Sequence, residues 1–102
     1  MLEIDDQLQI DDAELIERFV RASGPGGQNV NKVASAVELR FDVVNSAALP
    51  DALRARLLAR RDRRLTAEGV LVIQASRFRD QAKNREDARA RLVELIRAAQ
   101  RV

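Results

Sequence analysis

The chain has 102 residues and a mass of 11.4 kDa, which suffices for one ordinary domain and is too little for two. Its composition, 46% hydrophobic and 33% charged with a net charge of +2, is that of a folded protein and excludes a disordered one. It contains no His and no Cys, which excludes Ser–His–Asp triads, Cys nucleophiles, disulfides, haem centres and ordinary zinc sites.

Two strands are predicted on either side of a long loop. Residues 14–21 are rich in β-branched and aromatic side chains, which favours a strand. Over about 35–43, apolar residues alternate with charged ones, as is typical of a half-buried strand. The loop between them, residues 22–31, holds three of the four glycines and one of the two prolines. The pattern at 2–4 is compatible with a further short strand.

The second half of the chain begins with a predicted helix followed by a strand. Pro50 and Asp51 are typical of a helix start, and this helix is expected to run to about Leu65. Arg61 and Arg64 fall on the same side as its leucines, so either the helix ends early or these side chains extend along its edge. The apolar run at 70–75 favours a central strand buried on both faces.

The segment from about 81 to 99 predicts the clearer helix, because its apolar residues recur at intervals of three and four opposite charged residues. These apolar residues are Ala88, Leu92, Leu95, Ile96 and Ala99. The element order predicts an α+β fold, with a small mixed or antiparallel β-sheet of three to four strands, two helices packed on one face and a long Gly-rich loop between two strands. No repeat or linker divides the chain.

Basic residues are concentrated in the second half of the chain. There are 4 basic and 10 acidic residues up to residue 51, but 14 basic and 6 acidic residues from residue 52 onward. All but two of the 18 basic residues are Arg, whose planar guanidinium suits phosphate contacts. This pattern favours a nucleic-acid partner, and the alternative is that the arginines are solvated helix faces paired with local carboxylates. No apolar run approaches the ~20 residues of a membrane span, so we expect a cytoplasmic protein without a membrane partner.

The glycine-rich loop allows two interpretations. Gly26 and Gly27 permit backbone conformations with positive φ and the close approach of a partner, while Pro25 restricts the chain just before them. Such a sequence between two strands is commonly a plain connection. A loop of about ten residues is nevertheless longer than a hairpin needs, and such loops are commonly functional.

Two segments of the sequence resemble a known family. Residues 21–32, Arg-Ala-Ser-Gly-Pro-Gly-Gly-Gln-Asn-Val-Asn-Lys, followed by Ser-Ala-Val at 35–37, resemble the Gly-Gly-Gln catalytic loop of bacterial-type peptide-chain release factors and their relatives. Residues 79–85, Arg-Asp-Gln-Ala-Lys-Asn-Arg, are similar to the family's Arg-x-Gln-x-x-Asn-Arg/Lys signature. The chain has no room for codon-reading domains, so it most resembles the stand-alone ribosome-rescue members. It departs from the family at Asn29, where His is common, and at Asp80, where Ser is frequent.

The resemblance implies a single catalytic domain over residues 1–102, without the basic C-terminal tail of the rescue members. It implies codon-independent hydrolysis of peptidyl-tRNA on stalled ribosomes by a monomer that needs no metal or cofactor. The implied partners are the rRNA of the peptidyl-transferase centre and the P-site peptidyl-tRNA. The implied catalytic residues are Gly26, Gly27 and Gln28. The implied RNA-binding residues are Arg21, Lys32, Arg79, Gln81, Asn84 and Arg85.

The chemistry of these residues limits their roles. The amide of Gln28 cannot act as a general base, so its side chain is expected to position water, while its backbone N–H donates to charge that develops in the reaction. For residues 79–85 the alternative to RNA binding is a helix cap and a local hydrogen-bond cluster that holds the base of the loop. For the whole chain the alternative is a non-catalytic ribosome- or rRNA-binding module.

Overall fold

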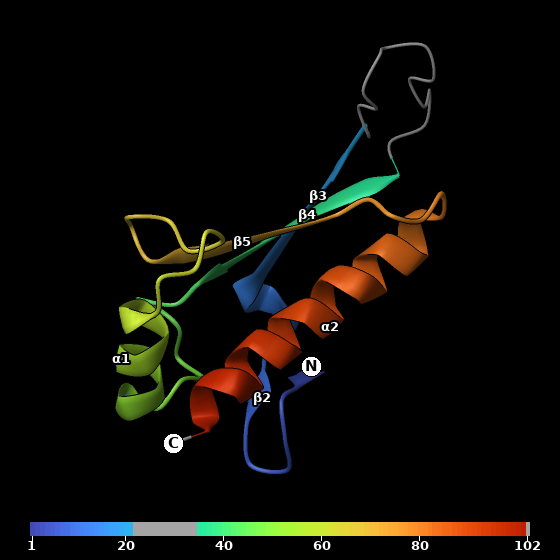
Figure 1. Ribbon diagram of the computed structural model, residues 1–102. Coiled ribbons are helices and arrows are strands. Elements are labelled where there is room, and N and C mark those ends of the chain that lie inside the picture. The colour runs from blue at the N-terminus through green and yellow to red at the C-terminus, as the bar shows by residue number, and fades with distance from the viewer. Residues whose placement is uncertain (22–34, 102) are drawn as a thin grey trace.

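The computed structural model describes residues 1–21 and 35–101 and has the α+β architecture that the sequence predicts (Figure 1). Two antiparallel sheets, one of two strands and one of three, are combined with two α-helices and one 3₁₀ turn. The elements are β1 (Leu2–Glu3), β2 (Gln9–Ile10), η1 (Asp12–Glu14), β3 (Leu15–Val20), β4 (Ala36–Asp42), α1 (Asp51–Ala59), β5 (Val70–Ala75) and α2 (Gln81–Gln100). The predicted Gly-rich loop lies outside the described residues.

The larger sheet has the strand order β3–β4–β5, and both of its strand pairs are antiparallel. β4 lies in the centre, and its side chains alternate as predicted. Val37, Leu39 and Phe41 are at most 1% exposed, whereas Arg40 between them is exposed. The predicted strands at 14–21 and 35–43 are therefore confirmed, with ends that differ by a residue or two.

The prediction that 70–75 forms a central strand is wrong, because β5 is an edge strand. Its side chains alternate between buried and partly or fully exposed positions. The continuous apolar run is explained by the segment that follows α1, which runs along the free edge of β5. The N–H of Val72 donates to the carbonyl of Arg64 over 2.7 Å, and Leu65 forms a bridge with Leu71. This segment covers the edge of β5 that does not pair with β4 and that would otherwise be open to solvent.

The small sheet at the N-terminus pairs β1 with β2. Its turn is closed by Asp5, whose Oδ1 accepts hydrogen bonds from the N–H groups of Gln7 and Leu8, both over 2.8 Å. The hairpin buries Ile4 and Ile10 completely. The short strand near 2–4 matches the sequence pattern, but its partner β2 is too short to leave a periodic signal.

α2 lies across one face of the larger sheet and packs mainly on β4 and β5 (Figure 1). All five of its predicted apolar positions are buried, and together with the sheet and the hairpin they form one core. The largest buried side chains of this core are Phe41, Ile4, Ile10, Leu39, Leu57, Leu71, Ile73, Leu92 and Ile96.

α1 packs against α2 and is shorter than the predicted helix to Leu65. It ends at Ala59, and Arg60 is already extended with ψ of 140°. Asp62 then forms a turn in which its Oδ1 accepts from the N–H of Arg64 over 2.9 Å. A longer helix would have directed Arg61 and Arg64 toward the core with the leucines, so the early end predicted as the alternative is the one observed.

Three parts of the chain meet at one end of the larger sheet. β3 ends at Val20, β4 begins at Ala36, and these two residues are paired, so the chain leaves and re-enters the sheet at neighbouring points. The N-terminus of α2 lies at the same end (Figure 1). The fold thus places the strand ends that flank the 22–34 segment at the same end of the molecule as the predicted signature segment 79–85, although they are far apart in the sequence.

Replacing Gly69 by Ala is expected to destabilise the fold. Gly69 has φ of +84°, and an added Cβ would lie 2.3 Å from Cγ2 of Val44. The positive φ alone costs about 1–2 kcal/mol for an L-residue. We expect Gly69→Ala to lower the free energy of unfolding in urea by at least this amount. In the double variant with Val44→Ala the steric part should disappear, and a double variant as stable as wild type would contradict the assignment of strain to φ.

Candidate functional site

The base of the 22–34 segment is formed by the ends of β3, β4 and β5. A hollow of about 340 Å³ opens there between the strand ends. It is lined by Val20, Arg21, Ala36, Val37, Gln74, Ala75 and Ser76. The predicted catalytic residues Gly26, Gly27 and Gln28, and the predicted RNA contact Lys32, lie outside the described residues.

Asn84 is the residue that joins α2 to this base. Its side chain is fully buried, and its Nδ2 donates to the carbonyls of Ser35 over 2.8 Å and Phe78 over 2.9 Å. Its Oδ1 accepts from the N–H of Phe78 over 3.0 Å. One amide thus holds the first described residue after the 22–34 segment and the turn before α2. We call Asn84, Ser35 and Phe78 the Asn84 cluster.

The Asn84 cluster corrects the expectation that Asn84 contacts RNA. A side chain with no exposed surface and with hydrogen bonds at both ends of its amide has nothing left for an external phosphate. The alternative interpretation, a local hydrogen-bond cluster at the base of the loop, describes this residue. The sequence contained no sign of its two partners, because both contribute backbone atoms.

Asp80 begins α2 as a helix cap. Its Oδ1 accepts from the N–H of Lys83 over 3.2 Å, which satisfies one of the free donors of the first turn. Capping requires a short polar side chain, and Asp serves this purpose as well as the Ser that the family frequently has. The departure from the signature at this position is therefore structurally neutral.

Asp87 holds the turn before α2 from the other side, and the sequence analysis overlooked it. Its carboxylate is almost buried and lies 3.0 Å from Nη2 of Arg77 and 3.1 Å from Nη2 of Arg91. The guanidinium of Arg77 also lies over the ring of Phe78, 5.1 Å from its centroid. The spacing of four between Asp87 and Arg91 is the one signal that could have revealed this group.

Arg85 and Arg89 bind the same carboxylate on β3. Arg85 Nε lies 3.0 and 3.1 Å from the two oxygens of Glu17, and Arg89 donates to the same two oxygens through Nη2 and Nε over 3.0 and 3.1 Å. The hydrogen bonds from Arg89, followed by those from Arg85, hold the pKa of Glu17 below its ordinary value. Arg85 remains half exposed and, among the described residues, donates to Glu17 through Nε alone, which leaves its two Nη groups as donors for a phosphate.

The remaining predicted RNA contacts lie on the surface near the same end of the sheet. Arg79 and Gln81 are exposed beside the start of α2, and Arg21 is exposed where β3 ends. Arg79 and Arg21 form no ion pair with any residue of the described ranges. The structure thus brings Arg79, Gln81 and Arg85 together at the N-terminus of α2, with Arg21 across the base of the loop.

A family model described as RF-1 domain matches residues 2–102 of this sequence. The chain belongs to the RF-1 domain family. The sequence is 54% identical over 99 residues to peptidyl-tRNA hydrolase ArfB of Pseudomonas putida, covering 97% of this chain and 72% of that protein. It is 31% identical over 84 residues to mouse large ribosomal subunit protein mL62, covering 82% of this chain and 41% of that protein. It is 37% identical over 75 residues to peptide chain release factor 2 of Streptomyces avermitilis, covering 60% of this chain and 20% of that protein.

The described residues of this RF-1 domain offer neither a group of metal ligands nor a membrane-spanning helix. In the part of the chain that the structure describes, no three His, Cys, Asp or Glu side chains are grouped so that they could hold a metal ion. Neither described helix has the length and apolar character needed to cross a membrane.

Replacing Asn84 by Asp is expected to destabilise the RF-1 domain strongly. The two shapes match, but the carboxylate would face the carbonyls of Ser35 and Phe78 without the two hydrogen atoms that they accept. A buried charge without partners costs on the order of 3 kcal/mol or more. We expect this loss in the free energy of unfolding at pH 7, measured with urea.

The matched control for this variant is Gln7→Glu, which makes the same change from amide to carboxylate on an exposed side chain. It should leave the unfolding midpoint within error of wild type. Equal stabilities of Asn84→Asp and Gln7→Glu would show that the Asn84 cluster does not hold the fold.

Replacing Glu17 by Gln is expected to give a pH-dependent loss of stability. Because the pKa of Glu17 is lowered in the folded state, its carboxylate stabilises the fold at pH values above its ordinary pKa of 4.5. This contribution, roughly 1 kcal/mol for a partly solvated group, is lost as the pH falls through the lowered pKa. The difference between wild type and Glu17→Gln should therefore be full at pH 7 and shrink below pH 4.5. Glu68→Gln, at an exposed carboxylate outside the described ion pairs, should show no such trend, and a difference that is constant with pH would argue against the assignment.

Proposed function

We propose that this RF-1 domain is a peptidyl-tRNA hydrolase that acts on the ribosome and releases nascent chains from stalled ribosomes without reading a codon. The observation that carries this proposal is the 54% identity, over nearly the whole chain, to a protein named peptidyl-tRNA hydrolase ArfB. The presence of Gly26, Gly27 and Gln28 in the sequence supports it, since these are the residues that the family resemblance assigns to catalysis.

In this proposal residues 1–102 form one catalytic domain and the reaction is the attack of water on the ester of peptidyl-tRNA. The chain has no His or Cys, and Gln28 cannot take a proton. The backbone N–H of Gln28 stabilises the charge that develops on the reacting oxygens, and its side chain confines the site so that water fits. Neither a metal nor a cofactor takes part.

The partners in this proposal are the rRNA of the peptidyl-transferase centre and the P-site peptidyl-tRNA, met by the protein as a monomer in the cytoplasm. Arg21, Lys32, Arg79, Gln81 and Arg85 contribute the RNA contacts around the base of the loop. Support comes from the exposed guanidinium groups of Arg21 and Arg79 and from the free Nη groups of Arg85. Phosphate contacts of this kind position a protein on RNA.

The Asn84 cluster has a part in this function that does not involve RNA. It fixes Ser35, the point where the chain re-enters the sheet, against the turn that carries Phe78. A catalytic loop must present its backbone N–H within a few tenths of an ångström of the correct place, so a rigid base is a requirement for catalysis of this kind.

A second candidate function is that of a ribosomal component that does not catalyse hydrolysis. The observation in its favour is the 31% identity to mouse large ribosomal subunit protein mL62, whose name places that protein in the ribosome. Both candidates share the ribosome as partner and differ in turnover, so a release assay separates them.

The proposed function is tested by peptide release from ribosomes stalled at the end of a truncated messenger RNA. Wild type should release the peptide at a rate that saturates with protein concentration. Gly27→Ala is expected to slow the saturated rate by roughly tenfold or more, because a side chain crowds the backbone that faces the substrate. Gln28→Ala should be slower than wild type but still active, because its backbone N–H remains.

Three comparisons make the release assay decisive. Gln7→Ala removes an exposed glutamine outside the loop and should release at the wild-type rate. A version of the chain with a basic peptide appended after Val102 tests whether weak binding limits the rate. If that version binds stalled ribosomes and releases nothing, the non-catalytic ribosomal module is the correct function. If Gly27→Ala and Gln28→Ala both match wild type, the loop is not the catalyst.

A further inference from the structure

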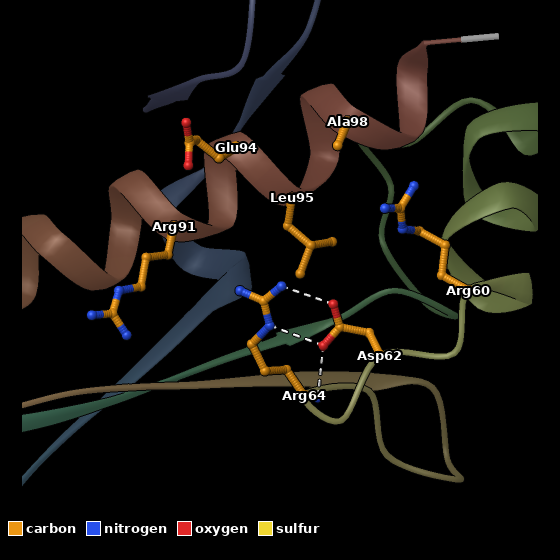
Figure 2. Close-up of a pocket in the computed structure, with 7 residues that line it drawn as sticks. All are labelled: Arg60, Asp62, Arg64, Arg91, Glu94, Leu95 and Ala98. Atoms are coloured by element: carbon orange, nitrogen blue, oxygen red, sulfur yellow. Dashed lines mark hydrogen bonds and ion pairs between the residues drawn. The ribbon is translucent and has the colours of Figure 1, made fainter.

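A second group of arginines lies away from the base of the loop, where the segment after α1 meets the C-terminal half of α2. Arg60, Arg63, Arg64 and Arg91 line two hollows of about 210 and 420 Å³. Arg64 and Arg91 belong to both hollows and form their common wall. Figure 2 shows the smaller of the two, with Arg60 and Arg64 approaching it from the segment after α1 and Leu95 above them. We call the two hollows together the arginine groove.

The carboxylates beside the arginine groove cancel only part of its positive charge. Asp62 is bound to Arg64, whose Nε and Nη2 donate to its two oxygens over 2.9 and 2.8 Å. These hydrogen bonds lower the pKa of Asp62 to about 2, so Asp62 is ionised at neutral pH and neutralises Arg64. The carboxylate of Glu94 is directed away from this pair (Figure 2). Arg60 and Arg63 are exposed, and neither forms an ion pair with a described residue.

The groove combines fixed and adaptable arginines. Arg64 is held by Asp62 and keeps its Nη1 free, while Arg91 is held by the carbonyl of Gln74 at 3.2 Å and by Asp87. Arg60 and Arg63 have no such restraint in the described part of the chain. Fixed guanidinium groups lose little conformational entropy on binding an oxyanion, and mobile ones can follow a backbone of varying shape.

All four cations of the groove are Arg, the side chain whose fork of donors matches the oxygens of phosphate. An open, shallow groove with several such forks suits a chain of phosphates better than one small enclosed anion. An acidic peptide would offer carboxylates only where its sequence placed them, whereas a nucleic-acid backbone carries a phosphate at every step. The groove is therefore best matched by a nucleic-acid backbone.

We propose that the arginine groove binds the phosphate backbone of RNA and is a second contact, distinct from the base of the loop. That this RNA is ribosomal rests on the proposed function, whereas the charge and shape of the groove do not depend on it. Along α2 the groove is lined by residues from Arg91 to Ala98, which lie 7 to 14 residues after Asn84, about 10 to 21 Å along the axis, and Gln74 lies between the groove and the hollow at the loop base. Two contacts at this separation would fix the orientation of the domain, which one contact cannot do.

The test is the salt dependence of binding to purified bacterial large ribosomal subunits, measured by fluorescence anisotropy of the dye-labelled full chain. The double variant Arg60→Gln/Arg63→Gln should bind more weakly than wild type, by about tenfold or more at 0.1 M salt. If each arginine neutralises one phosphate, the slope of log affinity against log salt falls by about two. The melting temperature should not change, because both side chains are exposed and bind nothing in the described structure.

The control is Arg18→Gln/Arg56→Gln, which removes the same charge from exposed positions outside the groove. It should keep the wild-type slope, and equal losses in the two double variants would overturn the proposal in favour of general charge attraction. A loss on intact subunits that is absent with protein-free large-subunit rRNA would also overturn it, because the groove would then bind a protein.

The release assay separates this proposal from the proposed function. Arg60→Gln/Arg63→Gln should reach the wild-type rate at saturating protein concentration and need more protein to do so. If neither wild type nor the version with the appended basic peptide releases peptide, but the groove variant loses affinity for subunit and rRNA, the groove binds RNA and the hydrolase function fails. If wild type releases peptide and the groove variant binds normally, the groove proposal alone fails.

Discussion

The structure depends on one buried amide. The side chain of Asn84 joins three backbone atoms from two distant parts of the chain, and it thereby ties α2 to the residue that precedes β4. Inside a protein such hydrogen bonds gain strength from the low dielectric, and an unmatched partner there is costly. The cluster therefore fixes the distance between strand end and helix start, and with it the place where the 22–34 segment leaves and re-enters the sheet.

The acidic first half of the chain and the arginine-rich second half form ion pairs with each other in the fold. Acidic residues of the first half, Glu17 and Asp12, lie against Arg89 of α2, and Arg85 shares Glu17. These ion pairs agree with the alternative interpretation of the arginine-rich second half, in which arginines of the helices pair with carboxylates. The ion pairs do not involve every arginine of the second half, since Arg60, Arg63 and Arg79 remain exposed and unpaired within the described residues. These exposed and unpaired arginines are the part of the positive charge that is available to a nucleic acid.

The sequence predicted those features that depend on local periodicity. β4 and α2 were predictable because each has one buried and one solvated face, and their alternations of two and of three to four record this directly. The edge position of β5 was not predictable, because its second flank is covered by residues 64–66, a contact without local pattern. The sequence left two alternatives for the end of α1, because a longer helix would place Arg61 and Arg64 on the same face as its leucines. Either the helix ends early or these two side chains extend along its edge.

The candidate site, like the fold, was predictable from the sequence only in part. The motif at 79–85 contains both buried and exposed residues, but it could not distinguish Asn84, which binds the backbone of Ser35, from residues that face solvent. Asn84 and Arg79 stand in one signature, yet one is fully buried and the other exposed. The difference arises because the partners of Asn84 are the carbonyls of Ser35 and Phe78, and backbone atoms carry no sequence signal. The motif therefore contains two kinds of residue. Buried residues such as Asn84 hold the backbone at the base of the 22–34 segment, and exposed residues such as Arg79 give the surface around it a positive charge.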